Sequence, residues 1–379
     1  MYNRKLIFAS ACAGLFLFGV GAITLGSIAP DLKTKFALDE LGIGGLFSLF
    51  PVGILVGSLS FGLITDRFGY KLLLAVCSLL LALGFAGIGL ATVIWVIQVC
   101  ILLIGVGGGA INGATSALVA DISEKNKAAS LALFGVFFGL GALAMPFILG
   151  LLRDVATFED IVLAIAALTF LLALVYFTLQ FPVAKHAEGI SLPQLGKMLK
   201  DPALLLIGSF LFWQSACEAL INNWTTSYLI EQKIDVRWTL YALTSYVAGL
   251  SLFRLLTGSL FRNIASSRML GVGMGLLIVG ALILGWLPGL AWAFTGLILV
   301  GFGLALGFPV MFGMSSSLYS KTSGTAIGII LAISLIGNLL ANFLMGYMAQ
   351  AWGIGVFSVA LLSAALVQAV FCFLVFRKA

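Results

Sequence analysis

Charged residues are scarce in this chain of 379 residues. Asp, Glu, Lys and Arg together make up 9% of the chain, and 62% of it is hydrophobic. Soluble domains carry roughly 25% charged residues. A soluble fold of this size could not bury so much apolar surface, because even a 300-residue fold exposes about a quarter of its unfolded surface. These proportions exclude a soluble enzyme, a nucleic-acid-binding protein and a disordered scaffold, so lipid is the expected solvent.

Histidine and cysteine are also few. The single His, His186, lies in a polar segment, and the five Cys lie within apolar runs at Cys12, Cys77, Cys100, Cys217 and Cys372. Buried thiols behave as small apolar residues, so we expect neither disulfides nor a metal site, and no cofactor. The sequence has no Walker-type lysine loop and no visible nucleophile–base pair, which excludes ATP-driven transport and argues against an enzyme.

Long hydrophobic runs are what the chain does contain. A spanning helix needs about 20 mostly apolar residues, and twelve such runs can be read. They cover roughly 6–30, 43–65, 71–91, 93–119, 127–152, 160–181, 203–230, 239–261, 268–287, 291–318, 323–350 and 354–376. We therefore predict an all-α membrane protein with twelve transmembrane helices. The third, sixth, ninth and twelfth are apolar almost all round, which suits exposure to lipid. No cleavage pattern follows Met1–Lys5, so we expect the first run to remain as a helix.

The basic residues predict the orientation. With the N-terminus inside, five of the twenty Lys and Arg residues lie in external loops, one lies within a span, and the remaining fourteen lie on the inner side. The five external ones are Lys33, Lys35, Arg153, Lys233 and Arg237. Cytoplasmic loops carry the excess of Lys and Arg. Both termini are therefore expected to be cytoplasmic.

An internal repeat appears when the chain is compared with itself at an offset of 196 residues. The matched pairs are Gly53 and Gly249, Gly62 and Gly258, Gly105 and Gly301, Gly107 and Gly303, Gly141 and Gly337, Phe147 and Phe343, and Gly150 and Gly346. We expect an N-terminal six-helix bundle (1–181), a cytoplasmic linker (182–202) and a C-terminal six-helix bundle (203–379). Two such halves are typical of transporters with a midplane site between repeats.

A signature lies between the second and third runs, where the chain reads Gly-x-x-x-Asp-Arg-x-Gly-x-Lys. Its residues are Gly62, Asp66, Arg67, Gly69 and Lys71. Gly62 permits close helix approach, Asp66 and Arg67 can form ion pairs, and Gly69 allows a tight turn. Here the chain resembles the major facilitator superfamily over its whole length. The resemblance implies alternating access between two bundles of six helices, with these residues as a conformational latch and not as a substrate site.

The fourth run narrows the resemblance. Residues 105–121, GVGGGAINGATSALVAD, are similar to the fucose permease and glucose/mannose:proton symporter group, which has a glycine run, a polar residue and small residues here. Asn112 and Thr115 are the polar residues of this stretch, and Gln98 lies nearer the outside. No strand precedes the glycine run, so it does not indicate a dinucleotide site.

Two formal charges lie deep in the spans, Glu218 in the seventh and Arg254 in the eighth. A central charge costs about 2.5–3.5 kcal/mol on insertion scales, so an idle one is not expected. One hypothesis is a structural salt bridge between the two. The other is that Glu218 is the coupling carboxylate, which titrates or binds a cation during transport. The two roles are compatible, because a nearby Arg could be exchanged for a proton.

Amides and indoles surround these charges. In the seventh run Gln214, Glu218, Asn222 and Thr225 share one helix face, and the eleventh adds Asn338 and Asn342, four residues apart. Such groups can bind sugar hydroxyls, and an aromatic plane can pack on the C–H face of a pyranose. The residues expected at the substrate are Asn112, Thr115, Gln98, Trp213, Gln214, Asn222, Asn223, Trp224, Asn338 and Asn342. The alternative for each amide is interhelical bonding, worth about 0.6 kcal/mol on average.

Together these features predict a secondary active transporter that imports a neutral, hexose-type sugar with a proton, or with sodium, through Glu218 and Arg254. The alternative on the same fold is a proton-coupled exporter of drugs or metabolites, which would favour an aromatic and Met-lined cavity. The expected partners are the sugar, the ion and the lipid bilayer, with no nucleic acid. We expect a monomer in a bacterial inner membrane.

Overall fold

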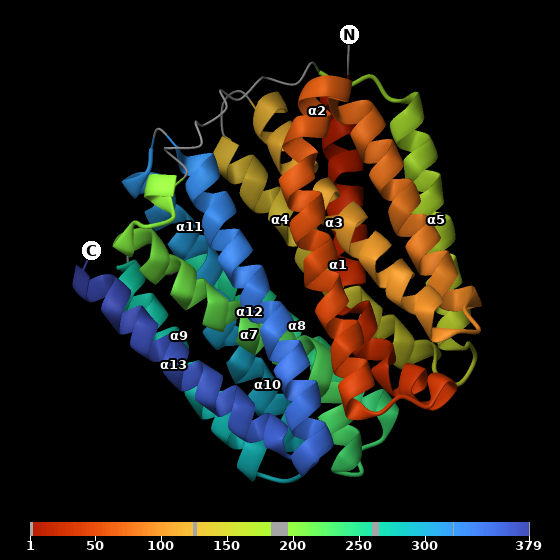
Figure 1. Cartoon of the computed structure of the whole chain (residues 1–379), viewed down its shortest axis with the longest axis vertical. Coiled ribbons are helices and arrows are strands. Elements are labelled where there is room, and N and C mark those ends of the chain that lie inside the picture. Colours follow the sequence, from red (N-terminus) through yellow and green to blue (C-terminus); the bar gives the residue numbers. More distant parts are fainter. Residues whose placement is uncertain (1–2, 124–126, 183–195, 260–264, 321, 379) are drawn as a thin grey trace. The chain divides into compact units, whose positions relative to one another are not determined.

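Every regular element in the computed structural model is a helix within the residues it describes, which are 3–123, 127–182, 196–259, 265–320 and 322–378. Figure 1 shows the helices. They are α1 (Arg4–Phe36), α2 (Glu40–Leu90), α3 (Ile94–Ile122), α4 (Lys127–Leu152), α5 (Phe158–Thr178), α7 (Pro202–Glu231), α8 (Val236–Ser259), α9 (Ser266–Trp286), α10 (Leu290–Leu304), α11 (Gly307–Leu318), α12 (Ser323–Trp352) and α13 (Val356–Lys378). Twelve segments are long and apolar enough to cross a membrane, which confirms the predicted fold class.

Three of the spans do not coincide with one helix each. The second and third both belong to α2, where Gly69 has a φ of +77°. This left-handed conformation suits glycine, so the tight turn expected at Gly69 is present. The tenth span, Leu290–Leu318, is divided into α10 and α11 by a break at Ala305 and Leu306.

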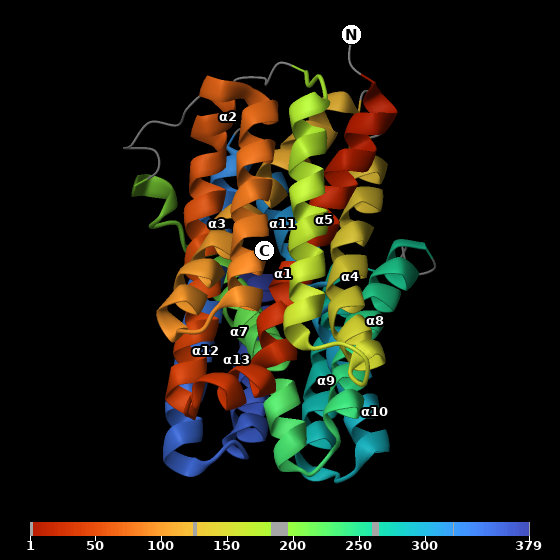
Figure 2. The same cartoon turned by 90° about the vertical axis from the view of Figure 1, so that its right-hand side faces the viewer.

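The chain forms two compact units. Unit 1 comprises Met1–Leu38 and Leu46–Ala187, and unit 2 comprises Asp39–Gly45 and Glu188–Ala379. In unit 1, α1 packs chiefly on α4 and α3, as Figures 1 and 2 show. In unit 2, α7 packs chiefly on α12 and α13, and α10 on α9 and α8. The predicted bundle limits remain a prediction, and residues 183–195 of the expected linker lie outside the described residues.

The repeat is confirmed by the contacts of its glycines. A Cβ at Gly53 would lie 2.7 Å from the carbonyl oxygen of Leu102, and one at Gly249 would lie 2.8 Å from that of Ile298. Leu102 and Ile298 are themselves 196 residues apart. The offset read from the sequence therefore relates the same helix crossing in the two units.

A second crossing repeats in the same way. A Cβ at Gly141 of α4 would collide with the carbonyl oxygen of Phe16 on α1, and one at Gly337 of α12 would collide with that of Phe212 on α7. Both pairs are again 196 residues apart. The glycines are required because the two backbones approach too closely for any side chain.

Polar contacts fasten some helix ends. Arg153 forks onto Asp31 with two hydrogen bonds of 2.8 and 2.7 Å, which joins the end of α4 to α1. Asp201 caps α7 by accepting the backbone N–H of Ala203. Burial, together with a hydrogen bond to Asp201, raises the pKa of Tyr319 to about 12. The end of α11 is thus tied to the start of α7.

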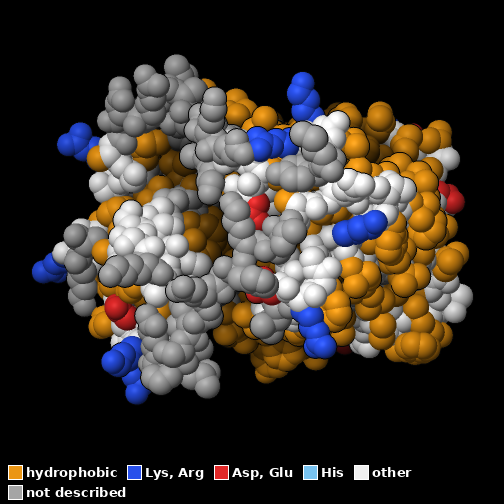
Figure 3. All heavy atoms as spheres, turned by 90° about the horizontal axis from the view of Figure 1, so that it is seen from above, with side chains coloured by type: hydrophobic (Ala, Val, Ile, Leu, Met, Phe, Trp, Pro, Cys, Tyr) orange, Lys and Arg blue, Asp and Glu red, His pale blue; other side chains and the backbone are white. Residues whose placement is uncertain are grey.

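Basic side chains are visible at the end of the molecule where the N-terminus lies (Figure 3). Arg67 and Lys71 are both exposed. The sidedness of the chain stays a prediction from the counts of Lys and Arg.

Candidate substrate and coupling site

Gln214 is the centre of a buried polar cluster in unit 2. Its side chain is 0% exposed. Its Nε2 donates to Glu218 Oε1 at 2.9 Å and to the Leu304 carbonyl at 2.8 Å, while its Oε1 accepts from Gln368 Nε2 at 2.5 Å. Three helices and the break after α10 therefore meet at one amide.

Glu218 and Arg254 lie close enough to interact electrostatically. Both side chains are half-buried. Arg254 Nε donates to the carbonyl of Ala305 at 2.8 Å, so the guanidinium is anchored by a backbone oxygen as well as by the field of the carboxylate. We call Gln214, Glu218, Arg254 and Gln368, with the two backbone carbonyls they contact, the Gln214 cluster.

Proline explains why a backbone carbonyl is open to Arg254. Pro309 has no N–H, so it cannot make the helical hydrogen bond to Ala305, four residues earlier. The Ala305 oxygen would remain unsatisfied inside the unit without another donor. Arg254 supplies it, and Gln214 similarly serves the neighbouring oxygen of Leu304. The break in the tenth span is thereby held by side chains from α7 and α8.

Three asparagines form a second polar group, which we call the amide ladder. Asn223 Nδ2 donates to Asn342 Oδ1 at 3.0 Å, Asn342 Nδ2 donates to Asn338 Oδ1 at 3.1 Å, and Asn338 Nδ2 reaches the Ser215 carbonyl at 3.4 Å. The ladder joins α7 to α12. Asn223, and not its neighbour Asn222, makes the contact to α12.

Asn222 differs from the ladder because its Oδ1 is buried and has no hydrogen-bond partner among the described residues. Thr225 Oγ1 is also buried without a hydrogen-bond partner among the described residues. Unsatisfied buried acceptors are costly, and they are available to hydroxyl groups of a ligand. Of the two indoles expected at the substrate, Trp213 is half-buried and packs edge-on against Phe212, whereas Trp224 is 0% exposed.

The candidates on the fourth span belong to unit 1 and lie on α3. Thr115 is 0% exposed and donates to the Ile111 carbonyl within its own helix. A Cβ at Gly14 would lie 3.7 Å from the Thr115 methyl group, so Thr115 packs against α1. Asn112 is half-buried and Gln98 is exposed. Their place at a substrate stays a prediction.

The signature segment carries one unexpected feature. A Cβ at Gly62 would meet no atom of the described residues within 4 Å, so the close approach expected there is not present in this structure. Asp66 and Arg67 are exposed, and the Arg67 guanidinium lies over the Phe68 ring at 5.2 Å. Tyr70, which follows Gly69, donates to Asp121 at 2.9 Å and ties this segment to the end of α3.

Sequence reasoning missed Gln368, because its helix is apolar almost all round. The residue is 0% exposed. Its signal was present, since a lone amide in the middle of an apolar span is costly in hydrocarbon and therefore needs a partner. The pattern could not reveal that this partner is Gln214.

Comparison with known proteins decides the family. The sequence model described as Major Facilitator Superfamily matches residues 11–322. The chain belongs to this superfamily. This major facilitator is therefore a multi-pass membrane transporter, as its twelve spans and repeat indicate.

Relatives of this facilitator have different substrates. It is 24% identical over 351 residues to the glucose/mannose transporter GlcP of Bacillus subtilis (strain 168), covering 88% of this chain and 86% of the relative. It is 20% identical over 370 residues to the class H tetracycline resistance protein of Pasteurella multocida, covering 92% and 91%. The solved D-xylose-proton symporter shares its fold with a TM-score of 0.81 and 15% identity, covering 97% of each chain.

The repeat of this facilitator provides an internal comparison for the Gln214 cluster. At the offset of 196, Gln214 corresponds to Phe18, Glu218 to Ala22, and Gln368 to Leu172. Phe18 lies against Gly108, the counterpart of Leu304. Unit 1 thus fills these positions without any amide or carboxylate, so the shared architecture does not require the polar set.

Arg254 corresponds to Ser58, and here the contact itself is retained. Ser58 Oγ donates to the Gly109 carbonyl at 3.5 Å, and Gly109 is the counterpart of Ala305. The carbonyl is therefore served by a neutral hydroxyl in one unit and by a guanidinium in the other. The position of Pro309 is held by Gly113 in unit 1, and glycine keeps its N–H, so only the Ala305 carbonyl is left open by a proline.

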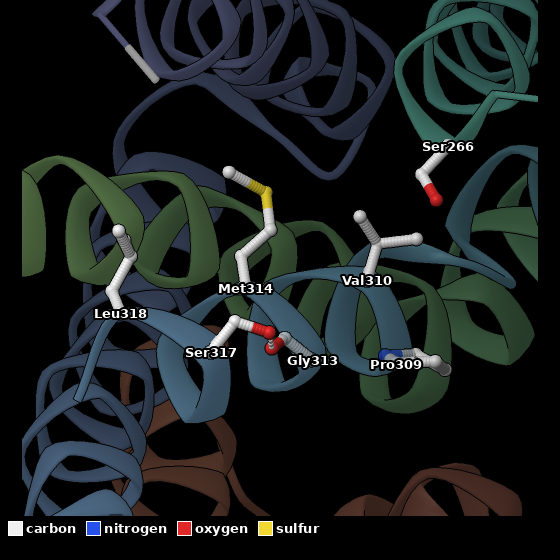
Figure 4. A pocket seen from close by; sticks show the side chains of 7 residues that line it. All are labelled: Ser266, Pro309, Val310, Gly313, Met314, Ser317 and Leu318. Atoms are coloured by element: carbon white, nitrogen blue, oxygen red, sulfur yellow. Dashed lines mark hydrogen bonds between the residues drawn. The ribbon is translucent and has the colours of Figure 1, made fainter. Parts of the chain in front are cut away.

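A cavity of about 510 Å³ lies along α11 in unit 2, lined by Ser266, Pro309, Val310, Gly313, Met314, Ser317 and Leu318. In Figure 4, Val310 and Met314 point from α11 to the same side. Ser266 lies on that side, and its hydroxyl points back toward Val310. Among these lining residues the polar side chains are two hydroxyls, with no amide or carboxylate. The sequence-predicted site residues do not line it.

Proposed function

We propose that this facilitator is a cation-coupled symporter that imports a neutral, hexose-type sugar. The observation that carries the proposal is the Gln214 cluster, which places a carboxylate, a guanidinium and two amides within one unit. The repeat supports a functional origin, because unit 1 has Phe18, Ala22 and Leu172 at the corresponding positions. GlcP, which is named a glucose/mannose transporter, supports the substrate class.

Glu218 would be the coupling group in this proposal. A half-buried carboxylate beside Arg254 can exchange the guanidinium for a proton or sodium ion as its partner. Gln214 donates to its Oε1 and holds it in place. Asn222, whose Oδ1 is unsatisfied, would bind a sugar hydroxyl together with the amide ladder. Asp66, Arg67 and their signature neighbours would act as the conformational latch of a protein in a bacterial inner membrane, with both termini cytoplasmic.

Uptake into proteoliposomes tests this proposal. We expect labelled glucose, mannose or another hexose to accumulate when a pH or sodium gradient is imposed, and to equilibrate without accumulating when it is absent. No gradient-dependent uptake of any hexose would contradict the sugar proposal. The two gradients are applied separately, so the result also assigns the ion.

The Glu218→Gln variant tests the coupling role. It keeps the hydrogen-bonding shape of the side chain but cannot ionise, so we expect gradient-driven accumulation to fall at least tenfold. Exchange of internal for external sugar needs no net ion movement and should persist. Gln180→Glu, at the end of the sixth predicted span, is a control for expression and insertion. Unchanged accumulation in Glu218→Gln would remove Glu218 from coupling.

The second candidate function is proton-coupled export of a drug or metabolite. The cavity along α11 favours it, because Met314 and other apolar side chains line it and no amide or carboxylate is among its lining residues. The class H tetracycline resistance protein supports it, because this relative matches the chain over a similar length to GlcP. Cells that express the chain should then tolerate more tetracycline or another toxic compound, and the purified protein should take up no hexose.

A further inference from the structure

Gln368 is a buried amide on α13, whose other residues before Arg377 are apolar or small. It is 0% exposed, and its Nε2 donates to Gln214 Oε1. Its own Oε1 has no hydrogen-bond partner among the described residues. An amide buried in this way costs stability unless its bonds are made. Gln368 is therefore poorly suited to apolar packing, and its contribution is the hydrogen bond that it donates to Gln214.

The direction of that bond agrees with the way in which Gln214 is turned, and Gln368 supports the amide from its oxygen side. A glutamine amide has one oxygen that accepts and one NH₂ group that donates twice. Because Gln368 donates to the oxygen, both N–H groups of Gln214 face the two acceptors, Glu218 Oε1 and the Leu304 carbonyl. A reversed amide would set its oxygen against those acceptors and its NH₂ against the NH₂ of Gln368. The donor side of Gln214 is thus held on Glu218.

A hydrogen bond donated to a carboxylate favours its ionised form. The charged and titratable groups around Glu218 are Arg254 and Tyr246 on α8 and Cys217 on α7 itself. In the part of the chain that the structure describes, the contacts that reach Gln214 from α10 and α13 are a backbone carbonyl and an amide. Gln214 is therefore a neutral donor to a carboxylate whose charged neighbour among these groups is Arg254.

We propose that Gln368 is a positioning residue for Glu218: it orients the Gln214 amide and so sets the pH at which the carboxylate takes up its proton. The proposal rests on the coupling role given to Glu218 above, and not on the identity of the sugar. Without Gln368, Gln214 is free to turn away and the carboxylate loses its donor. Its protonation then occurs at higher pH.

The repeat supplies the substitution for a test. Leu172 occupies the position of Gln368 in unit 1 and is 8% exposed. Gln368→Leu therefore introduces the residue that the same fold accepts there. Gln368→Met is a second variant of similar length that also lacks the donor. Gln180→Leu, at an exposed amide of unit 1, is the matched control.

Infrared difference spectra recorded during a pH titration measure the effect without any substrate. The carboxylic-acid band of Glu218 is assigned by its absence in Glu218→Gln. We expect the midpoint of this band to move to higher pH by about one unit in Gln368→Leu and Gln368→Met, because a bond to a charged group is comparable to the free energy of one such unit. Gln180→Leu should leave the midpoint unchanged. The pH dependence of labelled-glucose accumulation should move in the same direction.

Several results would overturn the proposal. An unchanged midpoint in folded Gln368→Leu would mean that Gln368 does not act on Glu218. Failure of both variants to fold would make it a structural residue. A wild-type protein without a Glu218 band would remove both the coupling and the positioning roles. By contrast, if the Glu218 midpoint shifts in a protein that takes up no glucose, the positioning role of Gln368 is kept and only the sugar proposal is contradicted.

Discussion

Arg254 shows how one side chain can serve two partners. Its Nε binds the Ala305 carbonyl that Pro309 leaves open, and its charge acts on Glu218. Both hypotheses raised by the sequence, a structural pair and a coupling pair, allow the electrostatic contact. The backbone contact adds a third role, because it gives Arg254 a reason to be present whatever the charge on Glu218.

We predict that Arg254→Ser lowers the free energy of unfolding by about 2 kcal/mol, which is the scale of a lost hydrogen bond to a charged group. Serine is the residue at the equivalent position of unit 1, Ser58, so the substitution is one that this helix crossing accepts. Chemical unfolding in detergent, followed by tryptophan fluorescence, measures it. Ser58→Ala is the control in unit 1.

The double variant Arg254→Ser with Glu218→Gln separates the roles. If the backbone contact dominates, Glu218→Gln should recover less than half of the loss. Full recovery would make the ion pair the main function of Arg254, since removing both charges would then leave no uncompensated partner.

At the scale of the element, the break between α10 and α11 is the feature that the Gln214 cluster surrounds. Ala305 has helical angles, with φ −61° and ψ −36°, and Leu306 departs from them only moderately, with φ −104° and ψ −11°. A small adjustment would therefore make the tenth span continuous. Pro309 weakens such a continuation by removing one N–H.

We predict that Pro309→Ala joins α10 to α11 and slows transport. The restored N–H can bond to Ala305, which would compete with Arg254 and stiffen the span. We expect the free energy of unfolding to rise or stay level while the initial uptake rate of labelled glucose falls about fivefold, as gating residues often affect rate more than stability. Pro51→Ala within α2 is the matched control. A normal uptake rate in a stable Pro309→Ala would show that the break has no role in gating.

Particular residues show how far the sequence predicts this element. The sequence predicts the tenth span as one run, 291–318, and the structure divides it; once Pro309 is placed in this span, an open carbonyl at Ala305 follows. Which side chain donates to that carbonyl depends on how α8 is rotated against α10. The spacing of residues within one helix does not determine this rotation. The same reason explains why Asn223, and not Asn222, meets α12, because neighbouring residues on a helix point about 100° apart.

At the scale of the whole molecule, the repeat was the most accurate prediction. An offset of 196 residues, taken mainly from glycines, relates not only those glycines but also the carbonyls they contact. Close backbone crossings tolerate no side chain, so they leave a trace in the sequence. Gln368 left a weaker trace, because one amide in an apolar helix matches no repeat and no periodic pattern.

The repeat also predicts that the two units are equally sensitive to a methyl group added at equivalent glycines. Gly141 faces the Phe16 carbonyl and Gly337 faces the Phe212 carbonyl, so an added methyl group meets backbone in both places. We expect Gly141→Ala and Gly337→Ala each to lower the free energy of unfolding by about 1–3 kcal/mol, the usual cost of overpacking. Gly313→Ala and Gly328→Ala, where a Cβ meets nothing within 4 Å, are the controls. Detergent unfolding curves for the four variants provide the measurement. A loss confined to one member of the pair would contradict equivalence of the two crossings, and it would indicate that one unit can separate its helices where the other cannot.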